Sequence, residues 1–276
     1  MLALNNLFNV LSVPTALATR SYAPEKGNRA PAPSGRMAIA FHLQFPLLGP
    51  AMHFAWQVEP TQRIRMFLND MLVLHPNLPA DLSRALWVIS NTMHSTFARQ
   101  PWISNPDSKK RCILASMTVR DFLKEVGFES AEVVSVNLEI EAKRDREYLQ
   151  PLSIGDPLSN QPEKPGHWSG HMVTRVPEAD LLIDPTLYQA RRPRWMSLPG
   201  MMAAPTSSTM PRHPFNGLKG VSCAEGDFEG GAIRMGWYHY PTNWGWVGAP
   251  DTKLERRASV VAAMLRAFEQ REAAAA

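Results

Sequence analysis

The chain has 276 residues, of which 45% are hydrophobic and 20% are charged, and its formal net charge at pH 7 is +4. This balance excludes a chain that is disordered throughout, because enough apolar side chains are present to bury a core. The basic residues occur in short groups such as Arg191, Arg192 and Arg194, so nucleic-acid binding is not indicated. The sequence contains no run of about 18 apolar residues, so no membrane-spanning helix is expected.

Residues 1–58 predict an N-terminal extension that is partly irregular. Its opening, MLALNNLFNVLSVPTALATRSYA, is apolar, but it has no Lys or Arg before the apolar stretch and three Asn interrupt it, so a secretion signal is not expected. Cys112 and Cys223 are the two cysteines of the chain, too few for a disulfide framework and compatible with a reducing compartment. We therefore expect a cytoplasmic protein, with a single domain over residues 59–276.

Residues 60–99 predict two helices that form a helical layer. Their apolar residues recur at helical spacing: Ile64, Phe67, Leu68, Met71 and Leu72 in the first helix, and Leu82, Leu86, Trp87, Met93 and Phe97 in the second. We expect both to pack beside a third helix that carries Cys112.

That third helix is predicted from Asp107 or Ser108, either of which is a suitable cap, to Gly127, which ends it. A cysteine near a helix N-terminus lies where free backbone N–H groups and the helix dipole favour a thiolate. A single cysteine in an apolar helix is also commonly a small buried hydrophobic residue. The helix alone does not separate these two interpretations.

The next segments predict strands near residues 132–142, 171–177 and 180–185. Alternating apolar residues mark the first, and GHMVTRV and LLID form a hairpin through the turn PEAD. In that hairpin, His171 at the start of one strand faces Asp184 at the end of the other. His167 is an alternative base, although it precedes the strand, and Asp184 precedes a proline and is alternatively a turn cap.

The last third of the chain predicts a proline-rich loop over residues 192–218, a strand near 232–240, and a final amphipathic helix from Asp251 onward. Trp244 and Trp246 are expected in a loop over the sheet. This aromatic cluster is either core or an apolar wall for an acyl or peptide substrate.

Cys112, His171 and Asp184 follow one another in the order of a thiol nucleophile, its base and the carboxylate that orients the base. An imidazole raises the reactivity of a thiol by accepting its proton, and a carboxylate fixes the tautomer of that imidazole. The sequence has no CxxC or HExxH motif, so neither a metal nor another cofactor is expected.

Cys112 with its helix, the Gly170-His171 pair and the run Leu182 to Thr186 resemble the papain-like and transglutaminase-like cysteine enzymes. The resemblance covers roughly residues 105–190. The chain also resembles a group of uncharacterised bacterial and phage-type proteins that have a W-x-G-H strand followed by a DPTLxQ-like strand. This second resemblance implies a fold and a triad without a substrate.

The expected fold is α+β, with a helical N-terminal part and the nucleophile helix packed on an antiparallel sheet. The resemblance implies a thiol-dependent hydrolase that cleaves an amide, peptide or isopeptide bond in a peptide, protein or other amide substrate. A transglutaminase-like acyl transferase and an inactive interaction protein on the same scaffold are the alternatives. The Cys112 N–H is one expected oxyanion donor; Trp102, Asn105 and Trp168 are candidates for the second. Gln189 is either a polar contact in the site or a surface residue.

Overall fold

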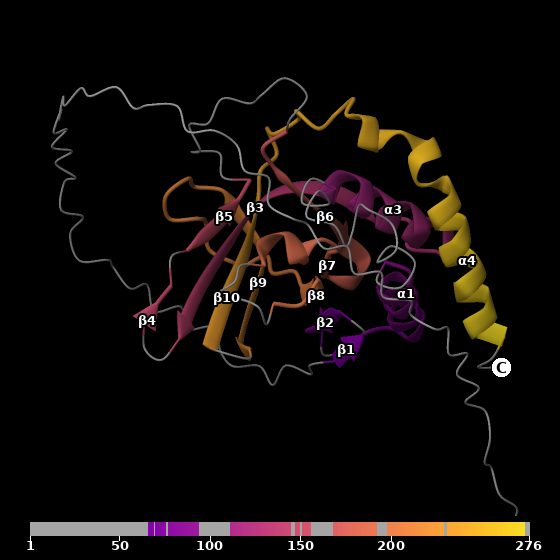
Figure 1. The fold of residues 1–276 in the computed structure, drawn as a ribbon, viewed down its shortest axis with the longest axis horizontal. Helices are drawn as coiled ribbons and strands as arrows, with labels where there is room; N and C mark the ends of the chain where they lie inside the picture. Colours follow the sequence, from indigo (N-terminus) through magenta and orange to yellow (C-terminus); the bar gives the residue numbers. More distant parts are fainter. Residues whose placement is uncertain are drawn as a thin grey trace, which may run out of the picture. The chain divides into compact units, whose positions relative to one another are not determined.

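Figure 1 shows the computed structural model, which describes residues 66–68, 70–75, 77–93, 111–144, 147–149, 151–155, 168–191, 198–228 and 231–273. The expected N-terminal extension lies outside the described residues.

The described part is α+β, and its ten strands form one sheet. The strands are β1 (Met66–Leu68), β2 (Met71–Val73), β3 (Glu132–Arg144), β4 (Glu147–Tyr148), β5 (Leu152–Ile154), β6 (His171–Val176), β7 (Leu181–Asp184), β8 (Met201–Pro205), β9 (Lys219–Phe228) and β10 (Gly231–His239). Their main order is β1-β2-β8-β7-β6-β3-β10-β9, and β4 and β5 pair with β3. The expectation of an antiparallel sheet is wrong for one pair, because β2 and β8 run parallel and make the sheet mixed.

The sheet curls until β8 and β9 meet. A single bridge joins Thr206 to Ser222, and the Ser222 hydroxyl donates a hydrogen bond of 2.8 Å to the Pro205 carbonyl. The inner face of the curl holds an apolar core to which β3 contributes every second residue, including Val136, Leu138 and Ile140. Alternation in the sequence of β3 therefore predicts its buried face correctly.

Three helices cover the outer face of the sheet in the described part of the chain: α1 (Ala80–Asn91), α3 (Cys112–Glu125) and α4 (Ala258–Ala273). Helix α3 lies against β6, and α4 packs on both α1 and α3 (Figure 1). Phe122 of α3 and Phe268 of α4 meet edge to face, with ring centroids 6.0 Å apart. The helices and strands enclose a second apolar core, separate from the core inside the curl.

The first of the two helices expected in residues 60–99 is wrong. Residues Met66–Leu68 and Met71–Val73 form the hairpin of β1 and β2, and β2 then pairs in parallel with β8. The sequence Asn69-Asp70 between two apolar triplets is a common turn signal. Pairing and burial of β2 outweigh the helical spacing of these residues, because propensity is weaker than tertiary contacts. The second expected helix corresponds to α1.

The expected loop over residues 192–218 is wrong in its middle, where β8 lies between β2 and β7. Its residues 201–204, MMAA, are all buried, and a strand covered on both faces has a continuous apolar sequence without alternation. The strands expected near 132–142, 171–177, 180–185 and 232–240 correspond to β3, β6, β7 and β10. The final helix starts later than expected, at Ala258, because the residues after Asp251 form the 3₁₀ turns η6 (Pro250–Thr252) and η7 (Leu254–Arg256).

Candidate active site

The hairpin of β6 and β7 brings His171 and Asp184 into direct contact. A 3₁₀ turn, η3 (Pro177–Ala179), joins the strands, and Asp180 after it adopts the left-handed conformation with a φ of 45°. Asp is among the residues that tolerate this conformation. His171 Nε2 lies 2.7 Å from Asp184 Oδ2, and both side chains are fully buried.

Asp184 is held by two further donors. The Trp237 indole N–H donates to Oδ2 over 3.1 Å, and the Thr186 backbone N–H donates to Oδ1 over 3.0 Å. Both groups can only donate, so the carboxylate accepts from them and His171 Nε2 supplies the proton of its own contact. Asp184 is therefore also a turn cap, as the alternative interpretation predicts, because it accepts from the Thr186 N–H while it contacts His171.

Because Nε2 of His171 binds Asp184, the second ring nitrogen, Nδ1, is the one that can accept or donate a proton in a reaction. Nδ1 makes no hydrogen bond to any described residue, while the Cys112 thiol is close enough to influence the ring. Burial alone lowers the pKa of His171, but the Asp184 carboxylate and, less strongly, the Cys112 thiol raise it from 6.5 to about 10. A pKa raised this far keeps the imidazole charged at neutral pH.

Cys112 is the first residue of α3, and Arg111 precedes the helix. The expected caps Asp107 and Ser108 lie outside the described residues, and α3 begins after them, with the Ala115 N–H donating to the Arg111 carbonyl over 3.0 Å. The N–H groups of residues 112–114 thus precede the helical ladder and point out of its N-terminus. The predicted end is confirmed: α3 stops at Glu125, and Gly127 follows with a φ of 100°, which glycine adopts without strain.

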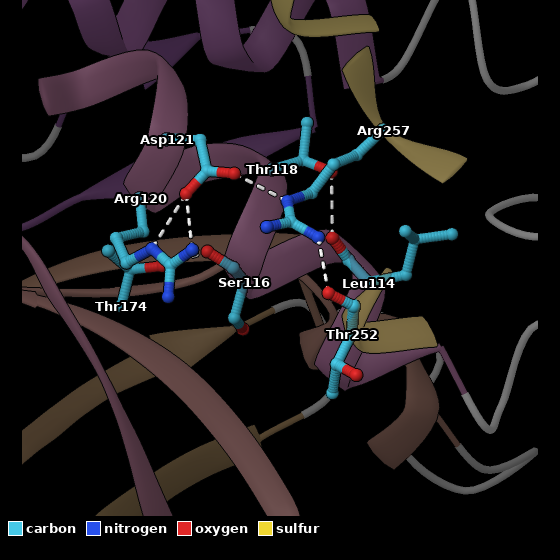
Figure 2. A network of polar contacts seen from close by, with 8 residues as sticks. All are labelled: Leu114, Ser116, Thr118, Arg120, Asp121, Thr174, Thr252 and Arg257. Carbon is cyan, nitrogen blue, oxygen red and sulfur yellow. Dashed lines mark hydrogen bonds and ion pairs between the residues drawn. The ribbon is translucent and has the colours of Figure 1, made fainter. Parts of the chain in front are cut away.

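Two hydroxyl groups hold α3 in register with β6. The Ser116 hydroxyl donates to the Met172 carbonyl over 2.8 Å, and the Thr174 hydroxyl donates to the Ser116 carbonyl over 2.9 Å. Figure 2 shows Ser116 and Thr174 at this contact. Ser116 lies one helical turn after Cys112, so these bonds fix the first turn of the helix beside the start of β6.

The thiol lies in an apolar surrounding. The Cys112 side chain is only 4% exposed and belongs to a buried cluster with Ile113, Met117 and Met172. Its sulfur is 4.0 Å from the Gly170 carbonyl oxygen, just before His171. Burial of this degree is also typical of an inert structural cysteine.

The remaining candidate residues have different outcomes. Trp102, Asn105 and the alternative base His167 lie outside the described residues. Trp168 packs against the Cys112 cluster, and its indole N–H donates to Asn243 Oδ1 instead of remaining free for an oxyanion. Gln189 is buried in the 3₁₀ turn η4 (Leu187–Ala190) and is not a surface residue.

The turn-cap interpretation of Asp184 did not name its donor Thr186, and the contact of Trp237 with Asp184 was not predicted at all. Thr186 carries a recognisable signal, because an Asp side chain often accepts from the backbone N–H two residues later. Trp237 has no such signal, since its contact depends on how the sheet curls.

Comparison with known protein families, curated proteins and solved structures found no match to this chain. Within the described residues, no helix is both long and apolar enough to cross a membrane.

Proposed function

We propose that the chain is a thiol-dependent hydrolase that cleaves an amide, peptide or isopeptide bond through an acyl-enzyme on Cys112. One observation carries the proposal: a buried His171–Asp184 pair, with Nε2 engaged and the ring influenced by a thiol at the start of a helix. A thiol nucleophile, a base beside it and a carboxylate that orients the base are the components of this class of site.

In the first half-reaction, the Cys112 thiolate attacks the carbonyl carbon, a C–S bond forms, and the carbonyl π electrons move to oxygen. When this oxyanion collapses, the C–N bond breaks and the leaving amine takes the proton of His171 Nδ1. The products are a free amine and a thioester on Cys112. Asp184 holds the imidazole throughout and stays ionised.

In the second half-reaction, a water molecule attacks the thioester while His171 Nδ1 accepts one of its protons. The C–S bond breaks, a carboxylic acid leaves, and the thiolate and the charged imidazole are restored. The oxyanions of both steps form at the N-terminus of α3, where the Cys112 backbone N–H and the helix dipole stabilise negative charge.

Two alternatives remain proposals beside this one. Resolution of the thioester by an amine in place of water makes the protein a transglutaminase-like acyl transferase, and burial of the thiol favours this by excluding water. Burial equally favours an inactive interaction protein in which Cys112 only fills space.

Alkylation with iodoacetamide at pH 6.5, followed by peptide mass spectrometry, tests the proposal. Cys223 is a built-in control, because it is more exposed than Cys112 and accessibility alone would label it first. We expect Cys112 to react first, and the Asp184→Asn variant to lose this preference. Preferential labelling of Cys223 in the folded wild-type protein overturns the proposal.

Incubation of the protein with a p-nitrophenyl ester then separates the two reactive alternatives. Hydrolysis releases acid at a rate independent of added amine, whereas acyl transfer gives an amide product that increases with amine concentration. If Cys112 is reactive but forms no thioester, both enzymatic alternatives are excluded and the interaction protein is the alternative that remains.

A further inference from the structure

The Cys112 cluster is bordered by two indole rings. Trp168 and Trp246 are partly buried and pack against the apolar residues around the thiol. The Trp168 ring lies so close to Gly170 that a methyl group added to that glycine would come within 2.0 Å of ring carbon. One wall beside the sulfur is therefore aromatic.

This aromatic wall continues to the protein surface. Among the described residues, Phe215, Trp244, Val247 and Leu254 are the large hydrophobic side chains that are exposed, and three of the four lie between residues 244 and 254. Trp244 is 65% exposed, and its ring centroid is 6.5 Å from that of Trp246. Apolar side chains thus pack one against the next from the buried thiol cluster through Trp246 to the exposed Trp244. Concentrated exposed apolar surface typically marks a binding site.

The segment that carries these residues is fixed at several points. The Asn243 side chain accepts from Trp168, and Asp251 pairs with Arg111 over 3.0 Å, next to Cys112. Figure 2 shows a further anchor, in which Arg257 donates to the Thr252 carbonyl over 2.7 Å and also pairs with Asp121 of α3. Trp244 is therefore exposed although the segment that carries it is anchored to the rest of the domain.

The charges near this surface are already compensated. Asp251 pairs with Arg256 as well as with Arg111, over 2.6 Å and 3.0 Å, so its carboxylate does not await a cationic ligand. Beside the thiol, the apolar residues Ile113, Met117 and Met172 form one cluster, and the His171 ring is its polar neighbour. The side formed by Trp168 and Trp246 therefore fits an uncharged apolar group, because burial of an unpaired charge against it would be costly.

We propose that the wall formed by Trp168, Trp246 and Trp244, with Val247 at its rim, binds an aromatic or long aliphatic acyl group of the substrate. This inference rests on the proposed function of Cys112. The acyl group is the part of the substrate that stays bonded to the sulfur, so it contacts the wall in both half-reactions. Trp244 and Trp246 are then specificity-determining residues.

A pair of alkylating probes tests the inference: chloroacetamide and N-(2-phenylethyl)chloroacetamide. Labelling rates of Cys112 are divided by the rates with free glutathione, which removes differences in intrinsic reactivity. We expect a preference of about tenfold or more for the phenylethyl probe, as partial burial of an aromatic ring provides.

Trp244→Ala should lower this preference by about threefold or more, because it removes the outer part of the wall. Phe215→Ala is the matched control, since Phe215 is a similarly exposed aromatic residue, 83% exposed, in another loop. It should leave the preference unchanged, and thermal melting checks that both variants fold. Loss of preference in both variants would overturn the inference.

The two proposals fail differently. If Cys112 reacts but equally with both probes, the apolar acyl site is wrong and the thiol chemistry stands. If Cys112 reacts with neither probe faster than Cys223, the proposed function is wrong and the inference falls with it.

Discussion

The contact between His171 and Asp184 should make the free energy of unfolding depend on pH, and removal of the Asp184 carboxylate should abolish this dependence. The pKa of His171 is about 10 in the folded chain and 6.5 as its ordinary value. Its contribution to stability is thus fully present below pH 6.5 and is lost as the pH rises towards 10. Between pH 7 and 9 the free energy of unfolding should fall by about 1 kcal/mol per pH unit, or about 2–3 kcal/mol in all.

The measurement is urea unfolding at pH 7, 8 and 9 in the Cys112→Ala background, which removes the thiol as a second titrating group. Asp184 remains there as the main cause of the raised pKa of His171. In Cys112→Ala/Asp184→Asn, burial is left without its opposing carboxylate and keeps His171 neutral, so the slope should disappear. The readout is this slope, so a general loss of stability in the double variant does not obscure it.

His239→Asn in the same background is the control. His239 is partly buried, and burial lowers its pKa below 6.5, so it is neutral in both states above pH 7. Its replacement should leave the slope intact. Equal slopes with and without the Asp184 carboxylate would refute the conclusion that His171 is charged in the folded chain.

Three substitutions test the supports of the site. Trp237→Phe removes an indole N–H from Asp184 and some core volume, and should lower the free energy of unfolding in urea by about 2–4 kcal/mol. It should also slow alkylation of Cys112, and unchanged alkylation would exclude a positioning role for Trp237. Ser116→Ala removes the donor to the Met172 carbonyl and should cost about 1–2 kcal/mol by the same assay; a neutral result would mean that water replaces the hydroxyl. Gly127→Ala forces alanine to a φ of 100° and should lower stability by about 1–2 kcal/mol, whereas a gain would show that the loop relaxes.

The sequence predicts the parts of the fold that depend on residue spacing and turn residues within one short segment. Alternation defines β3, aromatic residues indicate β10, and the turn PEAD between two short apolar runs defines the hairpin of β6 and β7. The His171–Asp184 contact follows from that hairpin, because both residues lie near its open end. The expectation that Cys112 lies near this pair came instead from the resemblance to papain-like and transglutaminase-like cysteine enzymes, in which the nucleophile helix packs on the sheet.

The parts that the sequence does not predict depend on pairing between distant segments. The residues of β2 show helical spacing, and only their parallel pairing with β8, far along the chain, makes them a strand. The contact of Trp237 with Asp184 likewise requires the curl of the sheet, since β10 and β7 are separated by β3 and β6 in the strand order. Neither arrangement leaves a periodic signal in a single segment.

The place of β10 in the sheet has a consequence for how the chain acquires its structure. It is the last described strand in the sequence, yet it lies between β3 and β9. Until β10 is in place, β3 presents an unpaired edge, and such edges associate with those of other molecules. We therefore expect refolding from denaturant to be slow and its yield to fall as protein concentration rises. A nascent chain that ends before β10 would already contain the hairpin of His171 and Asp184, but not the Trp237 indole that holds its carboxylate.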